Sequence, residues 1–209
     1  MVVCTRCRKK LPDNYHFCIY CGAKISPQVP VPEFSVHVRF DKPDEHAIAN
    51  FVEILNRKLA GIENRKQVVA ALAAAEMKGS GIAPLVKIYR SFTGVSERDA
   101  ETCMRSWCGQ AYNKSAWQRA KECAPYKEWV GTPHSDRTRP SHLAMNGVII
   151  PVDDYFVVPG FTDRFTGERI PEVLMLYPGD ESQEPHISQV CRCRCVLVPC
   201  FVSKKKGPF

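Results

Sequence analysis

Cysteine is the residue type that most clearly suggests chemistry in this chain, which has 11 cysteines among 209 residues. Two C-x-x-C pairs lie near the N-terminus and consist of Cys4, Cys7, Cys18 and Cys21. Two residues between cysteines allow a tight turn to direct both sulfurs at one ion, and a second pair completes the tetrahedral thiolate set that zinc prefers. A redox-active C-x-x-C would need only one pair beside a βαβ pattern. We therefore predict a zinc ribbon with one structural ion, whose binding supplies the folding energy of this short segment.

The predicted ribbon is basic, in a chain with a formal net charge of +7. Its clustered positive side chains are Arg6, Arg8, Lys9 and Lys10. Together with nearby aromatic residues they could contact nucleic acid, but ribbons also dock onto proteins. The residues leave both kinds of partner open.

A second cysteine group lies near the C-terminus, where Cys191, Cys193 and Cys195 alternate with arginine. If this segment is a strand, the three sulfurs share one face, because side chains alternate with period two. With His142 or Cys200 they would then form a second zinc site. Aligned cysteines also pack as buried thiols, or form a disulfide in an assembled extracellular particle. All three readings stay open.

A polar group formed by Asp136, Arg137, Arg139 and His142 precedes these cysteines. A carboxylate, a histidine and arginines are sufficient for phosphoryl or acyl chemistry. The sequence offers no second carboxylate at a short fixed spacing for Mg²⁺ and no nucleophile elbow. We therefore favour a buried polar network, in which arginines bind backbone carbonyls or a carboxylate, and we predict no catalytic residue.

The elements that must position these residues form two blocks. In the first block, residues 47–123, apolar residues recur at helical spacing. This pattern predicts helices over 47–61, 65–78, 84–92 and 97–123. Short apolar runs between turns follow Pro125, and they predict strands over 148–150, 155–158, 173–177 and 195–198. The fold class is therefore α+β, with a helical arm followed by a small β-rich domain.

Composition narrows the class of protein further. The chain is 44% hydrophobic and 24% charged, which excludes a collagen-like or wholly disordered protein. It contains no run of the roughly 18 to 20 apolar residues that a membrane helix needs, and its N-terminus lacks the pattern of a secretory signal. We expect a soluble chain that is not secreted.

The last block carries several motifs in a specific order. They are Trp129, residues 136–142 (DRTRPSH), Asn146 with Gly147, residues 153–156 (DDYF) and residues 193–195 (CRC). This order closely resembles the phage Mu F-like domain of minor head proteins. That family's pattern is a tryptophan, D-x-R-T-R-x-x-H, a D/N-G turn, an aspartate-aromatic strand and a terminal N-C-R-C. Here Arg192 replaces the asparagine, and Arg137 follows Asp136 directly.

The resemblance covers residues 126–200 and completes a division of the chain. We predict a zinc ribbon over 1–25, a Pro-rich linker over 26–45, a helical region over 46–125, a Mu F-like domain over 126–202 and a basic tail over 203–209. The residues of this chain that match the family's motif, and that the resemblance implies are structural, are Trp129, Asp136, Arg137, Arg139, His142 and Gly147.

The resemblance implies a phage minor head protein, also called a head morphogenesis protein. Such a protein is a structural, docking component of the capsid interior or portal region. It would act in procapsid assembly, with a further part in DNA packaging or delivery. The expected partners are the portal protein, the major capsid protein and phage DNA, with no membrane and no small-molecule substrate. The expected location is the virion, at the capsid interior or portal vertex, and the host cytoplasm during assembly.

Two other functions remain open from the sequence. In one, the protein binds nucleic acid mainly through its ribbon. In the other, it is a Mu F-like protein associated with a toxin, although the chain leaves little room for an added effector domain.

Overall fold

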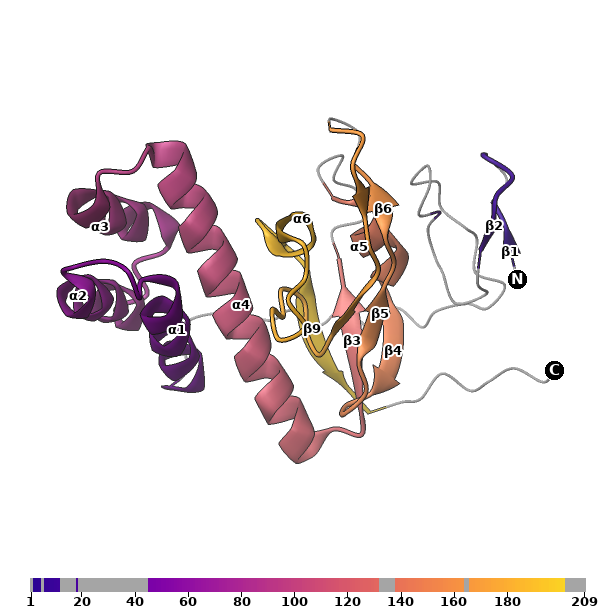
Figure 1. The fold of residues 1–209 in the computed structure, drawn as a ribbon. Helices are drawn as coiled ribbons and strands as arrows, with labels where there is room; N and C mark the ends of the chain where they lie inside the picture. The colour runs from indigo at the N-terminus through magenta and orange to yellow at the C-terminus, as the bar shows by residue number, and fades with distance from the viewer. Residues whose placement is uncertain are drawn as a thin grey trace. The chain divides into compact units, whose positions relative to one another are not determined.

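The structure is a computed structural model and describes residues 2–4, 6–11, 18, 45–131, 138–163 and 166–201. The chain divides into two compact units, one of residues Glu33–Ser115 and one that combines Met1–Pro32 with Ala116–Phe209 (Figure 1). Helices come first and small antiparallel sheets follow, which confirms the α+β class. The last turns of the longest helix group with the strands, so the division lies before the position 125/126 expected from sequence.

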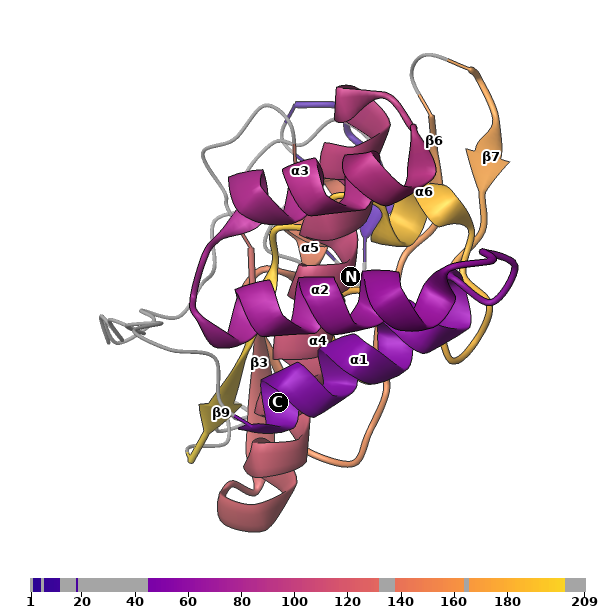
Figure 2. The same ribbon diagram turned by 90° about the vertical axis from the view of Figure 1, so that its left-hand side faces the viewer.

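Four helices build the unit Glu33–Ser115, and each was predicted to within a few residues. They are α1 (Glu45–Lys58), α2 (Arg65–Met77), α3 (Ile82–Thr93) and the first part of α4 (Glu97–Cys123). Figure 2 shows α1, α2 and α3 side by side across α4. Their apolar stripes meet in one core that includes Phe51, Leu55, Leu72, Leu85 and Met104. Gly94 ends α3 in the left-handed conformation (φ 68°) that suits glycine.

The described residues from 116 to 201, called the C-terminal unit below, form three small antiparallel sheets. One has the strand order β4-β3-β9, with β3 (Tyr126–Val130) between β4 (Val148–Pro151) and β9 (Val196–Cys200). In the others β5 (Phe156–Val158) pairs with β8 (Val173–Met175), and β6 (Phe161–Thr162) pairs with β7 (Arg169–Ile170). Two short helices complete the unit, α5 (Pro140–Met145) and α6 (Ile187–Val190).

The central strand β3 was not predicted from sequence. Its residues YKEWV place Lys127 and Glu128 at central positions, so the run lacks the apolar alternation that indicates a strand. Lys127 nevertheless shares the buried face with Trp129. The other short elements that escaped prediction, α5, α6, β6 and β7, are too short to show a period.

Trp129 lies at the centre of the C-terminal core and is fully buried. Its ring meets Phe156 and His142 edge to face, with centroids 5.3 Å and 5.4 Å away. Aromatic pairs of this geometry contribute about 0.5–1.5 kcal/mol beyond the area that they bury. The motif tryptophan therefore joins β3, β5 and α5 into one core.

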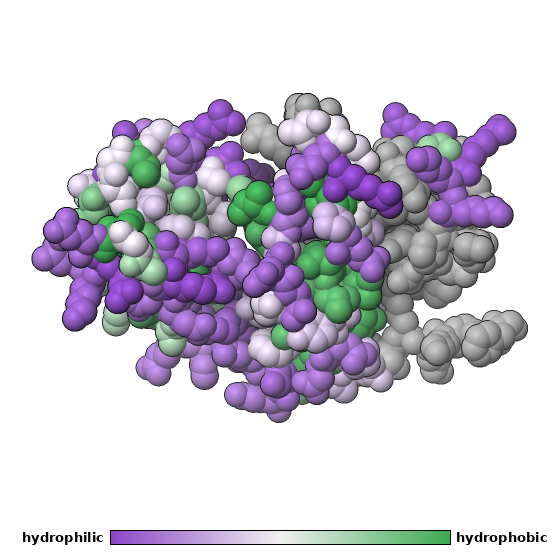
Figure 3. Space-filling model, in the orientation of Figure 1, coloured by the Kyte–Doolittle hydropathy of each residue, from purple (hydrophilic) through white to green (hydrophobic). Residues whose placement is uncertain are grey.

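Some hydrophobic side chains of this unit are exposed to solvent. Val157 and Leu174 are direct cross-strand partners on β5 and β8, and they are 45% and 41% exposed. Figure 3 shows hydrophobic residues at the surface of the C-terminal unit among mainly hydrophilic ones. Among the described helices, none combines the length and the apolar character needed to cross a bilayer.

Candidate metal centres and the family motif

The first C-x-x-C pair is held in a tight turn between two paired strands. β1 (Val2–Val3) runs antiparallel to β2 (Lys10–Leu11), and Cys4 donates its N–H to the carbonyl of Lys9 at 3.0 Å. Arg8 donates in turn to the carbonyl of Cys4 at 2.9 Å and adopts a left-handed φ of 56°. The chain therefore reverses immediately after Cys7.

This turn gathers the sulfurs that the sequence singled out. Ligand atoms of Cys4, Cys7 and Cys18 lie within 4.8 Å of one another, and the Cys7 and Cys18 sulfurs are 3.3 Å apart. The Cys7 backbone N–H points at Cys4 Sγ, 3.5 Å away, and such a donor stabilises a thiolate. The fourth predicted ligand, Cys21, lies outside the described residues. The donor set fits Zn²⁺, which Cys4, Cys7 and Cys18 would hold in a structural site.

The four basic residues proposed as nucleic-acid contacts surround this turn. Arg6, Arg8, Lys9 and Lys10 are all exposed. They therefore form an exposed basic cluster around the first C-x-x-C pair.

The N-G turn of the C-terminal motif lies between α5 and β4 and is hydrogen-bonded to the end of β3. Gly147 has a φ of 76°, which favours glycine, and donates its N–H to the Trp129 carbonyl at 2.8 Å. The Asn146 side chain accepts the Gly131 N–H at 2.8 Å. Both residues of the turn therefore bind the end of α5 to the end of β3.

Helix α5 carries His142 into the core, where it is 1% exposed. Arg139, just before the helix, donates from its guanidinium to the carbonyl of Cys191. This backbone contact ties α5 to the cysteine-rich segment 52 residues further along the chain. Asp136 and Arg137, the other charged members of the predicted network, lie outside the described residues.

The structure brings His142 together with two of the three C-terminal cysteines. Nδ1 of His142 lies 3.4 Å from Cys193 Sγ and 3.5 Å from Cys195 Sγ. All three ligand atoms lie within 4.8 Å of one another. Cys191 is not part of this group, and Cys200 is paired with Tyr126 at the other end of β9.

Residues 191–195 do not form the strand that would place all three sulfurs on one face, whereas the strand predicted over 195–198 corresponds to β9. Cys191 and Arg192 lie in a turn after α6, Arg192 has a left-handed φ of 53°, and β9 begins only at Val196. Period-two alternation therefore does not place these side chains. The turn, closed by the Cys193 N–H to the Val190 carbonyl at 3.3 Å, separates Cys191 from the other two sulfurs.

Comparison with protein families gives two matches. Residues 66–198 match the model described as Phage Mu protein F like protein, and residues 3–25 match a zinc-ribbon domain. The first match covers more than half of the 209 residues. The chain belongs to the phage Mu protein F like family. No curated protein and no solved structure matched it.

The Mu F-like match begins earlier than the resemblance indicated. It starts at residue 66, at the beginning of α2, whereas the motifs recognised in the sequence begin at Trp129. Helices α2, α3 and α4 are therefore part of the Mu F-like region.

The surroundings of Cys193 and Cys195 favour the thiolate form of Cys193. The pKa of Cys193 is held well below its usual value, because Cys195 donates a hydrogen bond to it and His142 lies beside it. The pKa of Cys195 rises in response, since its proton is shared with Cys193 and the thiol is buried. The Trp129 indole and the Arg139 charge oppose that rise.

Lys127 and Gln189 are buried polar residues of the Mu F-like region that the sequence analysis did not identify. Lys127 Nζ donates to the Leu176 carbonyl at 2.8 Å and lies 5.2 Å from the Phe156 ring centroid, and burial lowers its pKa to about 8. Gln189 accepts a hydrogen bond from Ser141 and donates to two proline carbonyls. Neither belongs to a recognisable motif or to an apolar period, so no sequence pattern marks it.

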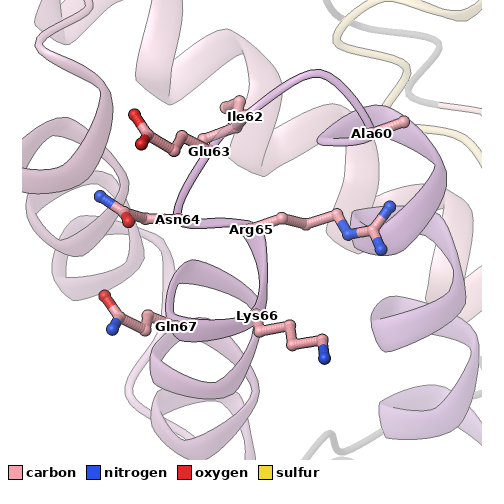
Figure 4. A pocket seen from close by; sticks show the side chains of 7 residues that line it. All are labelled: Ala60, Ile62, Glu63, Asn64, Arg65, Lys66 and Gln67. Carbon is pink, nitrogen blue, oxygen red and sulfur yellow. The ribbon is translucent and has the colours of Figure 1, made fainter.

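A depression beside the turn between α1 and α2 has no features of a binding site. Its lining residues are Ala60, Ile62, Glu63, Asn64, Arg65, Lys66 and Gln67. Figure 4 shows the polar side chains pointing away from one another, with Glu63 on one side and Arg65 on the other. Small-molecule sites need polar groups that converge, and these do not.

Proposed function

We propose that this Mu F-like protein is a minor head protein that acts in head morphogenesis as a docking component of the capsid interior or portal region. The observation that carries the proposal is the family match over residues 66–198. The fold supports it, because the motif residues Trp129, His142 and Gly147 come together in one core and one turn. Function therefore rests on binding surfaces of a rigid domain rather than on catalysis.

The position of Arg139 supports a structural role for the motif. Its guanidinium binds a backbone carbonyl, which is how an arginine fixes a loop. The docking partners that we propose are the portal protein and the major capsid protein. The ribbon, with one structural zinc held by Cys4, Cys7, Cys18 and Cys21, supplies a second contact.

Deletion of the gene from the phage or prophage that encodes it tests the proposal. We expect fewer procapsids, or procapsids that lack portal or packaged DNA, as seen by electron microscopy and by nuclease-protected DNA. Complementation with the wild-type chain restores them, whereas Trp129→Ala, which empties the centre of the Mu F-like core, does not. Normal yields of filled heads from the deletion strain would refute a role in assembly.

The four exposed basic residues of the ribbon favour a second activity, contact with phage DNA. Neutralising four phosphates gives a slope of about −3 to −4 for log K against log salt concentration on duplex DNA. Charge reversal at Arg6, Arg8, Lys9 and Lys10 should abolish that slope. If the reversed variant binds DNA with the same affinity and salt dependence, the ribbon docks onto protein instead.

A further inference from the structure

A second group of metal-binding side chains lies inside the Mu F-like region, away from the ribbon cysteines in sequence. It consists of His142 from α5 and of Cys193 and Cys195 from the segment between α6 and β9. His142 is 1% exposed and Cys195 is 3% exposed, while Cys193 is partly buried. Buried groups of this kind need either hydrogen-bond partners or an ion.

The distances match those of a zinc site. Zn–S bonds of about 2.3 Å and Zn–N bonds of about 2.0 Å at the tetrahedral angle place nitrogen and sulfur about 3.5 Å apart. The observed separations from His142 Nδ1 are 3.4 Å to Cys193 Sγ and 3.5 Å to Cys195 Sγ. One ion can therefore contact all three donors without a change in the backbone.

The near-equal distances bear on the alternatives. A single S–H···N hydrogen bond accounts for only one of these two contacts. A disulfide would turn both sulfurs toward each other and remove their capacity to bind the ring nitrogen. A cation bound by all three donors accounts for both short separations from Nδ1.

The surrounding residues hold the three donors in place. Arg139 binds the Cys191 carbonyl, and the turn at Arg192 directs the chain back toward α5. The Trp129 ring packs against the His142 ring with centroids 5.4 Å apart. These contacts restrain the backbone beside the cysteines and the imidazole ring of His142.

We propose that His142, Cys193 and Cys195 form a second zinc site, which joins α5 to the segment before β9. Two thiolates and an imidazole select a soft or borderline ion such as Zn²⁺ over Mg²⁺ or Ca²⁺. Three protein donors leave the fourth tetrahedral position to a water molecule. This site is independent of the ribbon and of the proposed role in the phage head.

The test is the zinc content of the purified full chain, measured by inductively coupled plasma mass spectrometry. We expect about two zinc ions per chain, and about one when all four ribbon cysteines are changed to serine. Adding Cys193→Ser to that ribbon variant should reduce the content to near zero. Cys191→Ser and Cys200→Ser, two nearby cysteines outside the group, serve as matched controls and should retain the ion.

Cobalt substitution keeps the test valid if a variant is less stable. In the ribbon variant, Co²⁺ should produce the thiolate charge-transfer and d–d bands of a tetrahedral S₂N site. Cys193→Ser should remove these bands while circular dichroism shows that the fold is kept. The proposal is refuted if the folded ribbon variant binds neither metal, if peptide mass spectrometry finds a Cys193–Cys195 disulfide, or if the two control variants lose the ion equally.

Discussion

Gln189 offers a sharp test of how the C-terminal unit is held together. Its side chain is fully buried and joins three segments: its carbonyl accepts the Ser141 hydroxyl at 3.1 Å, and its amide donates to the carbonyls of Pro159 and Pro171, each at 3.3 Å. Gln189→Met keeps the length and nearly the volume but removes all three hydrogen bonds. Each contributes about 1 kcal/mol net, and the groups left behind are buried, so we expect a loss of about 2–4 kcal/mol.

Urea unfolding followed by tryptophan fluorescence measures this loss. A Trp107→Phe background confines the signal to Trp117 and Trp129, which both belong to the C-terminal unit. Gln183→Met is the matched control, because Gln183 is exposed and its replacement should change stability by no more than about 0.5 kcal/mol. If the Gln189 and Gln183 variants unfold at the same urea concentration, the hydrogen-bonded bridge does not stabilise the unit.

Three further predictions concern other parts of the chain. The stability of the wild type relative to a Lys127→Met variant should rise between pH 7 and 9.5, as measured by urea titrations. Burial lowers the pKa of Lys127 to about 8 from 10.5, so the unfolded chain binds more protons than the folded chain between these values. Gly147→Ala, at a φ of 76°, should cost about 1–2 kcal/mol in the same assay, and an effect no larger than that of the exposed Gln183→Met control would contradict the argument from backbone strain. Cys4→Ser combined with Cys7→Ser should release the ribbon zinc and leave the urea midpoint of residues 116–209 unchanged, because the Pro-rich linker predicted over 26–45 separates the ribbon from the rest of the chain. A global loss of stability would instead place the ribbon in the main core.

The sequence was most informative where periodicity or fixed spacing carries the signal. Helices α1 to α4 follow from repeated apolar positions, and the ribbon follows from cysteine spacing alone. The strand β3 could not be predicted, since Lys127 is buried only because the fold supplies a carbonyl and an aromatic ring for it.

The cysteine-rich segment shows the limit of local reasoning. Period-two logic grouped Cys191 with Cys193 and Cys195, but a left-handed residue at position 192 breaks the period. The partnership with His142, 51 residues from Cys193, depends on how α5 packs. The sequence could name His142 as a candidate ligand but could not determine which sulfurs it meets.

The central claim, that the protein is a component of the phage head, is tested most directly by quantitative peptide mass spectrometry of purified particles. The account predicts that the chain is present at a small, fixed number of copies relative to the portal protein, in both procapsids and DNA-filled heads. Its absence from both kinds of particle, in preparations where the portal is readily detected, would contradict the claim.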